Sequence, residues 1–456
     1  MRDRLEEALR KSDAEYADIR VEDVTSSWVN FRGKELDSIG SSRTVGGIVR
    51  ARVLGGWGYA TFNDLDDLGR RVREACESAR LVGKETSQFA PVEPVVDETR
   101  ATLEKDFREV PLSQKKAVIE EYNDLILGYH KSIVTTNVRY GDSFRRIWYA
   151  NSEGTYIADE QPDVYVFTMA TARDGDNVQV AFESNGGSSG FQLVEGFHAK
   201  AEEAARRAVD LLSAPPVTGG TYTVVVDPRL AGVFAHEAFG HLSEADFVYE
   251  NPQMRELMKL GKRFGQDFLN IIDDGSAPGQ LGTHKYDFEG VPTRKTYLIK
   301  DGILVGRLHS RETAARMGEP VTGNARSTGY QHPPIVRMTN TYIDRGDATF
   351  EDMIRDIKLG VYALSSIGGQ TALEMFTFSA AYAYMIRDGQ VAELVRDVVL
   401  TGNVFETLMS IDMLGDRVEW EPGGPGGCGK GGQFPLRVGD GGPHVRIQNV
   451  VVGGRQ

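Results

Sequence analysis

One stretch near the middle of the chain favours neither helix nor strand. Ala214-Pro215-Pro216 ends any preceding helix, because proline lacks the backbone N–H that a helical turn needs, and Thr218-Gly219-Gly220 extends the break. We expect a helix before it, roughly from 195 to 212. At 456 residues the chain is long enough for two domains. We therefore predict one domain over residues 1–214, a linker over 213–220, and a second domain over 221–456.

The first half has the pattern of a sheet with helices. Ala17, Ile19 and Val21 alternate with charged residues, which predicts a half-buried strand. Residues 26–36 and 44–62 are rich in β-branched and aromatic side chains, as expected of an antiparallel sheet. Apolar residues spaced three or four apart indicate an amphipathic helix from about 64 to 81, and Cys76 lies on its apolar face. A further strand-rich stretch covers 132–191.

The second half begins with a buried-strand pattern, Tyr222 to Val226, followed by Asp227 and Pro228. Asp can cap a helix and Pro suits its first turn. Apolar alternation around Asp301-Gly302 and Asp388-Gly389 predicts two hairpins. Between 421 and 442, ten of 22 residues are glycine, so we expect irregular backbone there. The predicted class is α+β in both domains, each with an antiparallel or mixed sheet packed with helices.

Composition limits the compartment and the partners. The N-terminal residues 1–7 are charged and lack the apolar core of a secretory signal, and no apolar run approaches the roughly 20 residues that cross a bilayer. Two cysteines are too few for a disulfide framework, so we expect a cytoplasmic protein that does not contact the membrane. A net charge of −14 without a basic run argues against direct nucleic-acid binding.

The most informative segment runs from His236 to His241, on the helix that Asp227 and Pro228 begin. Imidazole nitrogens suit Zn²⁺, and Glu237, beside the first histidine, is placed to take a proton from a zinc-activated water. This combination is typical of a metallopeptidase.

The spacing of the two histidines differs from the usual zinc-protease pattern, in which they are four residues apart on one helix face. Five steps at about 100° each turn the second ring roughly 140° away from the first in a regular α-helix. We therefore predict a local irregularity, either a π-bulge or a helix end, which Gly240 would make easier.

A catalytic zinc site usually has three protein ligands, so a third is needed. Glu244, Asp246, a distant histidine and Cys428 are all candidates. Cys428 is favoured because the glycine-rich loop can bring a thiolate to the metal, and nearby Lys430 would favour the thiolate form. Cys76 is expected to be an ordinary core residue. His444 follows the glycine-rich loop closely and stays open as a ligand.

The sequence also resembles a known family, the TldD/PmbA peptidases, and the TldD side in particular. Four separated motifs carry the resemblance, in the expected order: Val225-Val226-Asp227-Pro228 through His236-Glu237-Ala238-Phe239-Gly240-His241 and Glu244-Ala245, then Val336-Arg337-Met338-Thr339-Asn340-Thr341-Tyr342, then Gly368-Gly369-Gln370, and finally Gly427-Cys428-Gly429-Lys430-Gly431-Gly432-Gln433.

The resemblance implies a zinc peptidase with His236, His241 and Cys428 as metal ligands and Glu237 as the catalytic glutamate. It also implies a dimer that encloses the site and admits short or unfolded peptides. The partner would be an identical chain or a PmbA-like paralogue that lacks the motif.

Two alternatives to the peptidase stay open. In the first, zinc is structural, closed by a fourth ligand such as Glu244 or His444, and the protein is a non-catalytic peptide-binding partner. In the second, the chain is a zinc amidohydrolase that acts on a small molecule.

Overall fold

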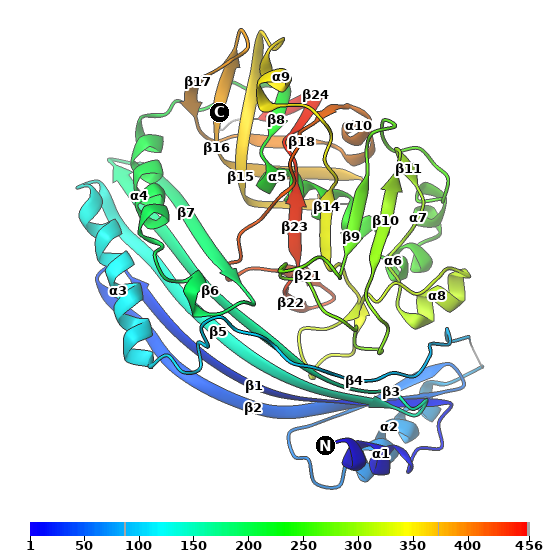
Figure 1. The fold of residues 1–456 in the computed structure, drawn as a ribbon. Coiled ribbons are helices and arrows are strands. Elements are labelled where there is room, and N and C mark those ends of the chain that lie inside the picture. Colours follow the sequence, from blue (N-terminus) through cyan, green and yellow to red (C-terminus); the bar gives the residue numbers. More distant parts are fainter. Residues whose placement is uncertain (86–87, 373, 454–456) are drawn as a thin grey trace.

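The computed structural model describes residues 1–85, 88–372 and 374–453, and it confirms the α+β class (Figure 1). Long curved strands of the first half lie against the compact second half. The last helix of the first half ends at Ser213 and the first strand of the second half begins at Gly220, the two ends of the predicted linker. The division into two domains stays a prediction.

The first half forms one seven-stranded sheet of order β3-β2-β1-β5-β6-β4, with β7 also paired to β6. All its pairings are antiparallel except that of β4 with β6. Both predicted helices are present, as α2 and α4. The elements are α1 (Arg2–Leu9), β1 (Tyr16–Arg32), β2 (Glu35–Val53), β3 (Gly56–Phe62), α2 (Leu68–Val82), β4 (Val96–Thr99), α3 (Leu112–Tyr129), β5 (Ile133–Asn151), β6 (Tyr156–Asp174), β7 (Asn177–Gly187) and α4 (His198–Ser213).

Two apolar clusters hold helices against this sheet. At one end, α1 and α2 pack on β1 and β2 around Leu5, Ile19 and Val72. At the other end, α3 and α4 pack around Tyr122 and Ala205. Figure 1 shows the two helix pairs at opposite ends of the long strands. The face of β1 opposite α1 and α2 is left to the second half of the chain.

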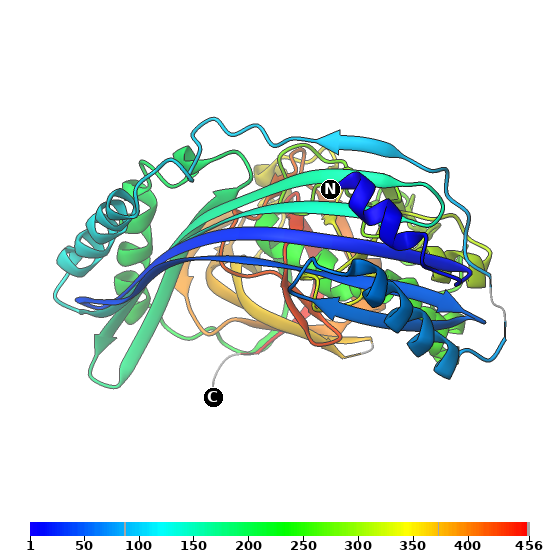
Figure 2. The ribbon, with the colours of Figure 1, turned by 90° about the horizontal axis from the view of Figure 1, so that it is seen from below.

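The strand predicted to be half-buried is buried on both faces, which corrects the sequence-based prediction. Its polar residues Asp18, Arg20 and Glu22 are buried, because the second half of the chain covers that face (Figure 2). Arg20 pairs with Glu22 at 3.0 Å, and its Nη2 donates to Oγ of Ser327 at 2.7 Å. Charged residues therefore form an interface here, where alternation alone would predict a solvated face.

The second half contains two larger sheets and two short strand pairs. One sheet has the order β11-β10-β9-β14-β23-β20, and the other β15-β8-β24-β18-β16-β17 with β19 beside β24. The elements are β8 (Gly220–Val226), α5 (Pro228–Phe234), α6 (Ala245–Glu250), α7 (Pro252–Leu257), β9 (Ile271–Asp274), β10 (Lys295–Lys300), β11 (Ile303–Leu304), α8 (Arg311–Met317), β12 (Ala325–Arg326), β13 (Ile335–Val336), β14 (Asn340–Ile343), α9 (Phe350–Ile354), β15 (Leu359–Ala372), β16 (Met375–Arg387), β17 (Gln390–Val395), β18 (Val399–Asn403), α10 (Val404–Met409), β19 (Ile411–Leu414), β20 (Glu419–Trp420), β21 (Cys428–Lys430), β22 (Gln433–Leu436), β23 (Gly439–Gly442) and β24 (Val445–Gly453).

The two hairpin turns and the capped helix predicted for this half are confirmed. The turns at 301–302 and 388–389 join β10 to β11 and β16 to β17, with positive φ at all four turn residues. Asp227 caps α5, because its Oδ1 accepts the N–H of Leu230 at 2.8 Å, and Pro228 occupies the first turn.

Within the described residues, no helix combines the length and apolarity needed to cross a bilayer.

The glycine-rich segment is more regular than predicted. It contains β21, β22 and β23, and β21 pairs with β22 as a hairpin in which Cys428 faces Leu436. Its two turn residues, Gly431 and Gly432, have φ values of 57° and 75°. A two-residue turn with positive φ at both positions suits a hairpin and favours glycine. The glycines here therefore build a defined turn and do not prevent strand pairing.

Candidate metal centre

The helix that carries the two histidines changes its geometry between them. After α5 the backbone forms a π-helical turn over Ala235–Gly240 and then a 3-10 turn over His241–Ser243. The N–H of His241 donates to the carbonyl of His236, five residues earlier. This widened turn absorbs one residue, so the two rings approach with centroids 5.1 Å apart. The predicted irregularity is confirmed.

Gly240 serves a different purpose from the one we expected. Its φ of −55° and ψ of −54° are ordinary helical values, open to any residue. A Cβ at this position would instead collide with the sulfur of Met338, just before β14. The glycine is therefore needed for close packing of the distorted turn on the neighbouring segment.

Cys428 of β21 meets both histidines. One candidate ligand atom from each of His236, His241 and Cys428 lies within 4.8 Å of the others, and Sγ of Cys428 is 3.5 Å from Nε2 of His241. His236 and Cys428 are buried, whereas the side chain of His241 is 25% exposed. Among the residues that the structure describes, this is the only group of three or more His, Cys, Asp or Glu side chains close enough to share a metal ion.

Each histidine has a carboxylate at its other ring nitrogen. Nδ1 of His236 lies 2.8 Å from Oδ1 of Asp440, and Nδ1 of His241 lies 3.0 Å from Oε2 of Glu244. Metal-binding histidines usually donate their second N–H to a carboxylate or carbonyl, which fixes the tautomer and the ring orientation. The arrangement leaves both Nε2 atoms available to a metal.

The other candidates for the third ligand contact groups outside the cluster of His236, His241 and Cys428 or contact it only through an outer nitrogen. Asp246 pairs with Nζ of Lys430 at 2.7 Å, and Glu244 receives both Lys430 and His241. Nε2 of His444 lies 3.0 Å from the hydroxyl of Tyr362. We expected Lys430 to favour the Cys428 thiolate, but its ammonium group instead pairs with the carboxylates of Glu244 and Asp246.

The charges of the cluster depend on one another. Burial raises the pKa of the Cys428 thiol, but the neighbouring His236 and His241 lower it to about 5. Burial lowers the pKa of His241, while Cys428 and Glu244 raise it to about 9. Burial also raises the pKa of Glu237, which is half-buried beside them. Without a metal the cluster therefore favours thiolate paired with imidazolium, and metal binding would release protons.

The donor set fits zinc. Two imidazole nitrogens and one thiolate sulfur match the ligand types that Zn²⁺ prefers, and three protein ligands are typical of catalytic sites. The carboxylates at both Nδ1 atoms supply the outer contacts that such a site needs.

Two positioning residues were missed from the sequence. Arg337 is fully buried, and its Nη2 donates to the carbonyl of Cys428 at 2.8 Å. Asp440 lies on β23. α5 packs closely on this strand at Gly232, where a Cβ would overlap the backbone of residues 440 and 441. Arg337 belongs to a motif that carried the family resemblance, whereas no spacing signal links Asp440 to His236.

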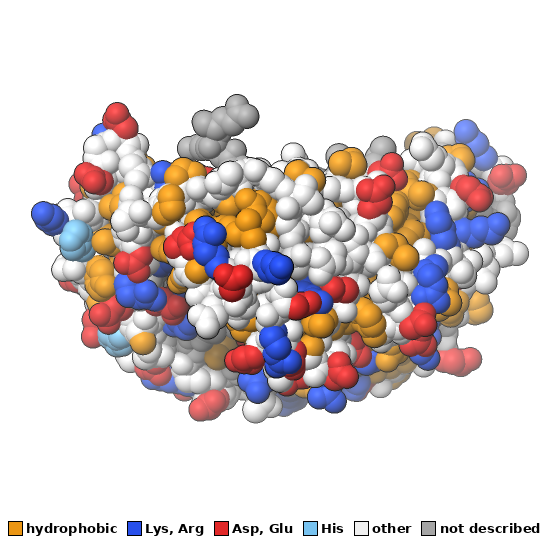
Figure 3. Space-filling model, turned by 90° about the horizontal axis from the view of Figure 1, so that it is seen from above, with side chains coloured by type: hydrophobic (Ala, Val, Ile, Leu, Met, Phe, Trp, Pro, Cys, Tyr) orange, Lys and Arg blue, Asp and Glu red, His pale blue; other side chains and the backbone are white. Residues whose placement is uncertain are grey.

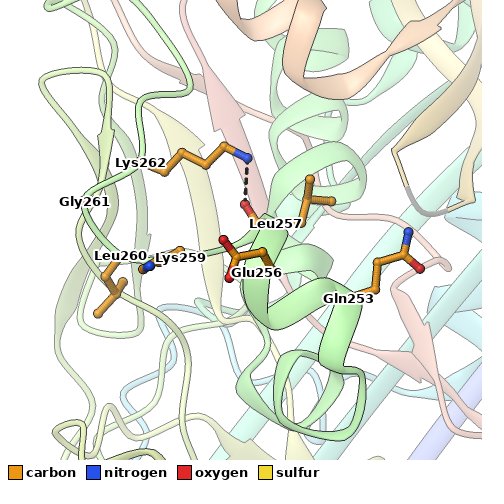
Figure 4. Close-up of a pocket in the computed structure, with 7 residues that line it drawn as sticks. All are labelled: Gln253, Glu256, Leu257, Lys259, Leu260, Gly261 and Lys262. Carbon is orange, nitrogen blue, oxygen red and sulfur yellow. Dashed lines mark hydrogen bonds between the residues drawn. The ribbon is translucent and has the colours of Figure 1, made fainter.

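Two other hollows of the surface are not lined by the candidate ligands, although the larger one includes Leu436, which pairs with Cys428. A cavity of about 670 Å³ separates the first sheet from the second half and is lined by Arg145, Asp159 and Arg326, among others. A shallower one surrounds the end of α7, where Nζ of Lys262 donates to the carbonyl of Leu257 (Figure 4). On the face shown in Figure 3, described Lys and Arg side chains lie among Asp and Glu without forming a basic patch.

Comparison with known families covers most of the chain. Models described as PmbA/TldA metallopeptidase domain 1, central domain and C-terminal domain match residues 17–80, 105–212 and 219–454. The third of these contains all the candidate site residues.

Individual relatives and solved structures agree with that match. A metalloprotease of Synechocystis is 48% identical over 97% of this chain and 96% of its own length. A protein named zinc metalloprotease TldD homolog, from Saccharolobus solfataricus, is 32% identical over 74% of this chain and 76% of its own. The crystal structure of TldE from Thermococcus kodakarensis shares the fold, with a TM-score of 0.79, 18% identity and 100% coverage of both chains.

Proposed function

The chain belongs to the PmbA/TldD family of metallopeptidases, and from that premise we propose that it hydrolyses short or unfolded peptides at a zinc ion held by His236, His241 and Cys428. The convergence of these three side chains, brought about by a π-helical turn and a distant hairpin, carries the proposal. The name of the relative from Saccharolobus solfataricus supports zinc as the metal.

Glu237 is the proposed general base. Zinc bound at this site would supply Lewis acidity, which makes water a stronger acid and polarises a peptide carbonyl. The Glu237 carboxylate accepts a proton from the attacking water and then passes it to the leaving amine. In the metal-free protein, burial raises the pKa of the Glu237 carboxyl.

The proposed substrate is an extended peptide. Such a chain adds to a sheet edge through main-chain hydrogen bonds, which give affinity with little sequence selectivity. We propose that a dimer encloses the site, formed with an identical chain or with a PmbA-like paralogue, and that the protein works in the cytoplasm. The dimer rests on the family resemblance, and the compartment rests on the composition of the chain.

A purely structural zinc is less consistent with the contacts. Such a site would normally be closed by a fourth protein ligand. Of the two candidates, Glu244 contacts Lys430 and His241, and His444 contacts Tyr362. This counts against the non-catalytic alternative, and a panel of unrelated short peptides would distinguish a peptidase from a small-molecule amidohydrolase.

The proposal is tested with Glu237→Gln, His236→Ala and the exposed control Glu250→Gln. We expect Glu237→Gln to keep its zinc and lose about 10²- to 10⁴-fold in peptide hydrolysis, the usual contribution of a general base. His236→Ala should lose zinc, and the control should change neither property. Full hydrolysis by Glu237→Gln with zinc bound would show that the base is a different residue.

A further inference from the structure

Lys430 makes an unusual set of contacts for a partly exposed lysine. Its Nζ lies 2.7 and 2.9 Å from the two carboxylate oxygens of Asp246, 3.1 Å from Oε2 of Glu244 and 2.8 Å from the carbonyl of Val336. Its side chain is only 21% exposed. One ammonium group thus joins the hairpin of Lys430 to two other segments, residues 244–246 and the carbonyl of Val336.

The backbone around Lys430 is held as firmly as its side chain. Lys430 is the last residue of β21 and pairs with Gln433 across the Gly431-Gly432 turn. Cys428 lies two residues earlier on the same short strand. The hairpin is short and its turn conformation is specified by the two glycines, so the position of Lys430 constrains that of Cys428 across the single register shift between them.

Glu244 depends on Lys430 for its charge balance. The carboxylate is 1% exposed, and Oε2 contacts Nδ1 of His241 at 3.0 Å as well as Nζ of Lys430. A neutral imidazole that ligates a metal through Nε2 can donate its N–H to this carboxylate but cannot neutralise it. Lys430 is then the contacting cation that compensates the buried charge, and removing one member of such a pair is costly.

We propose that Lys430 is a positioning residue of the metal centre, which links the hairpin that presents Cys428 to the carboxylate that orients His241. Lys430 thereby fixes the positions of Cys428 and His241, two ligands from distant parts of the sequence, relative to each other. The inference rests on the proposed metal site and adds a role for a residue outside the ligand set and the catalytic base.

The test uses cobalt as a probe, because Co²⁺ occupies zinc sites and its absorption reports thiolate ligation. Metal-free full-length protein is titrated with Co²⁺ for the wild type, Lys430→Met, Lys430→Arg and Lys115→Met. Lys115 is a matched control, since its Nζ pairs with Asp142 at 2.6 Å in the buried interior of the first half. We expect Lys430→Met to raise the Kd for Co²⁺ roughly 10- to 100-fold, as losses of outer contacts do, and Lys430→Arg to restore part of the affinity.

Lys115→Met should lower the unfolding midpoint and leave the Kd unchanged. Wild-type affinity in folded Lys430→Met would overturn the inference. If Lys430→Met does not fold, Glu244→Gln and Lys430→Arg/Glu244→Gln are compared. Because the arginine introduced at position 430 would act through Glu244, adding Lys430→Arg to Glu244→Gln should raise the Kd for Co²⁺ little further. Fully additive losses of affinity would overturn the inference. The failure of the metal site itself looks different, because the wild type and Cys428→Ala would then give the same Co²⁺ absorption spectrum.

Discussion

The two cysteines of the chain are buried to nearly the same extent, 2% exposed for Cys76 and 4% for Cys428, but in different surroundings. Cys76 lies on the apolar face of α2, and its sulfur has the hydroxyl of Ser12 at 3.5 Å. Cys428 lies between two imidazoles supplied by a segment almost 190 residues away. Burial alone therefore does not distinguish a core thiol from a candidate ligand, whereas the groups that face the sulfur do.

The largest expected effect comes from exchanging the two thiols for alanine in turn. Cys428→Ala removes one of three proposed ligands, so zinc affinity should fall by more than the roughly 100-fold that losing an outer contact costs. Peptide hydrolysis should be lost with the metal. Cys76→Ala should retain both. Zinc content of the purified proteins measures the difference, and equal zinc contents would remove Cys428 from the ligand set.

A smaller effect is expected at Asp440, which contacts His236 and not the thiol. Asp440→Asn keeps the shape of the side chain but removes the charge that supports the imidazole. We expect about a 10- to 100-fold loss of zinc affinity, measured by competition with a chelator. An unchanged affinity would mean that the 2.8 Å contact between Asp440 and His236 does not support the metal.

The pH dependence of alkylation should also separate the thiols. With a pKa lowered to about 5, Cys428 in the metal-free protein stays thiolate above that pH and becomes protonated as the pH falls below it. Iodoacetamide labelling of Cys428, followed by mass spectrometry, should be nearly constant between about pH 6 and 8 and fall about tenfold per unit below pH 5. Added zinc should protect Cys428. A rate that falls from about pH 9 downward would indicate an ordinary thiol.

The smallest effect concerns the stability contribution of Cys76. Its replacement by alanine leaves a small gap against α1 and β1, which we expect to cost about 1 kcal/mol of unfolding free energy. Urea denaturation measures this, with the exposed change Glu250→Gln as a control. A loss of zinc from Cys76→Ala would contradict the contrast between the two cysteines.

The sequence predicted what depends on local pattern. The helix with Cys76 on its apolar face, the capped start of α5 and the two hairpin turns follow from spacing and turn chemistry within a few residues. The helical irregularity between His236 and His241 also followed from their five-residue spacing, because a regular α-helix would turn the two rings away from each other. The choice of Cys428 over Glu244, Asp246 and His444 depended largely on the family resemblance.

What the sequence could not predict depends on contacts between distant segments. Asp18, Arg20 and Glu22 read as a solvated face because their covering residues come from the second half of the chain. Asp440 approaches the site from β23, and Arg337 from the residue that follows β13, both far along the sequence from His236. The glycine-rich segment was predicted to be irregular because composition does not reveal that two of its glycines form one hairpin turn.

The polar face of the first sheet has a consequence for the metal centre. Arg20 donates to Ser327 and to the carbonyl of Gly329, and Arg145 donates to the carbonyl of Thr328. The N–H of Thr328 in turn donates to the side chain of Gln433, in the hairpin of Cys428. A fragment that begins at residue 219 would possess every proposed ligand and yet lack the arginines that anchor this loop. The first half thus holds the loop whose Thr328 contacts the hairpin of Cys428.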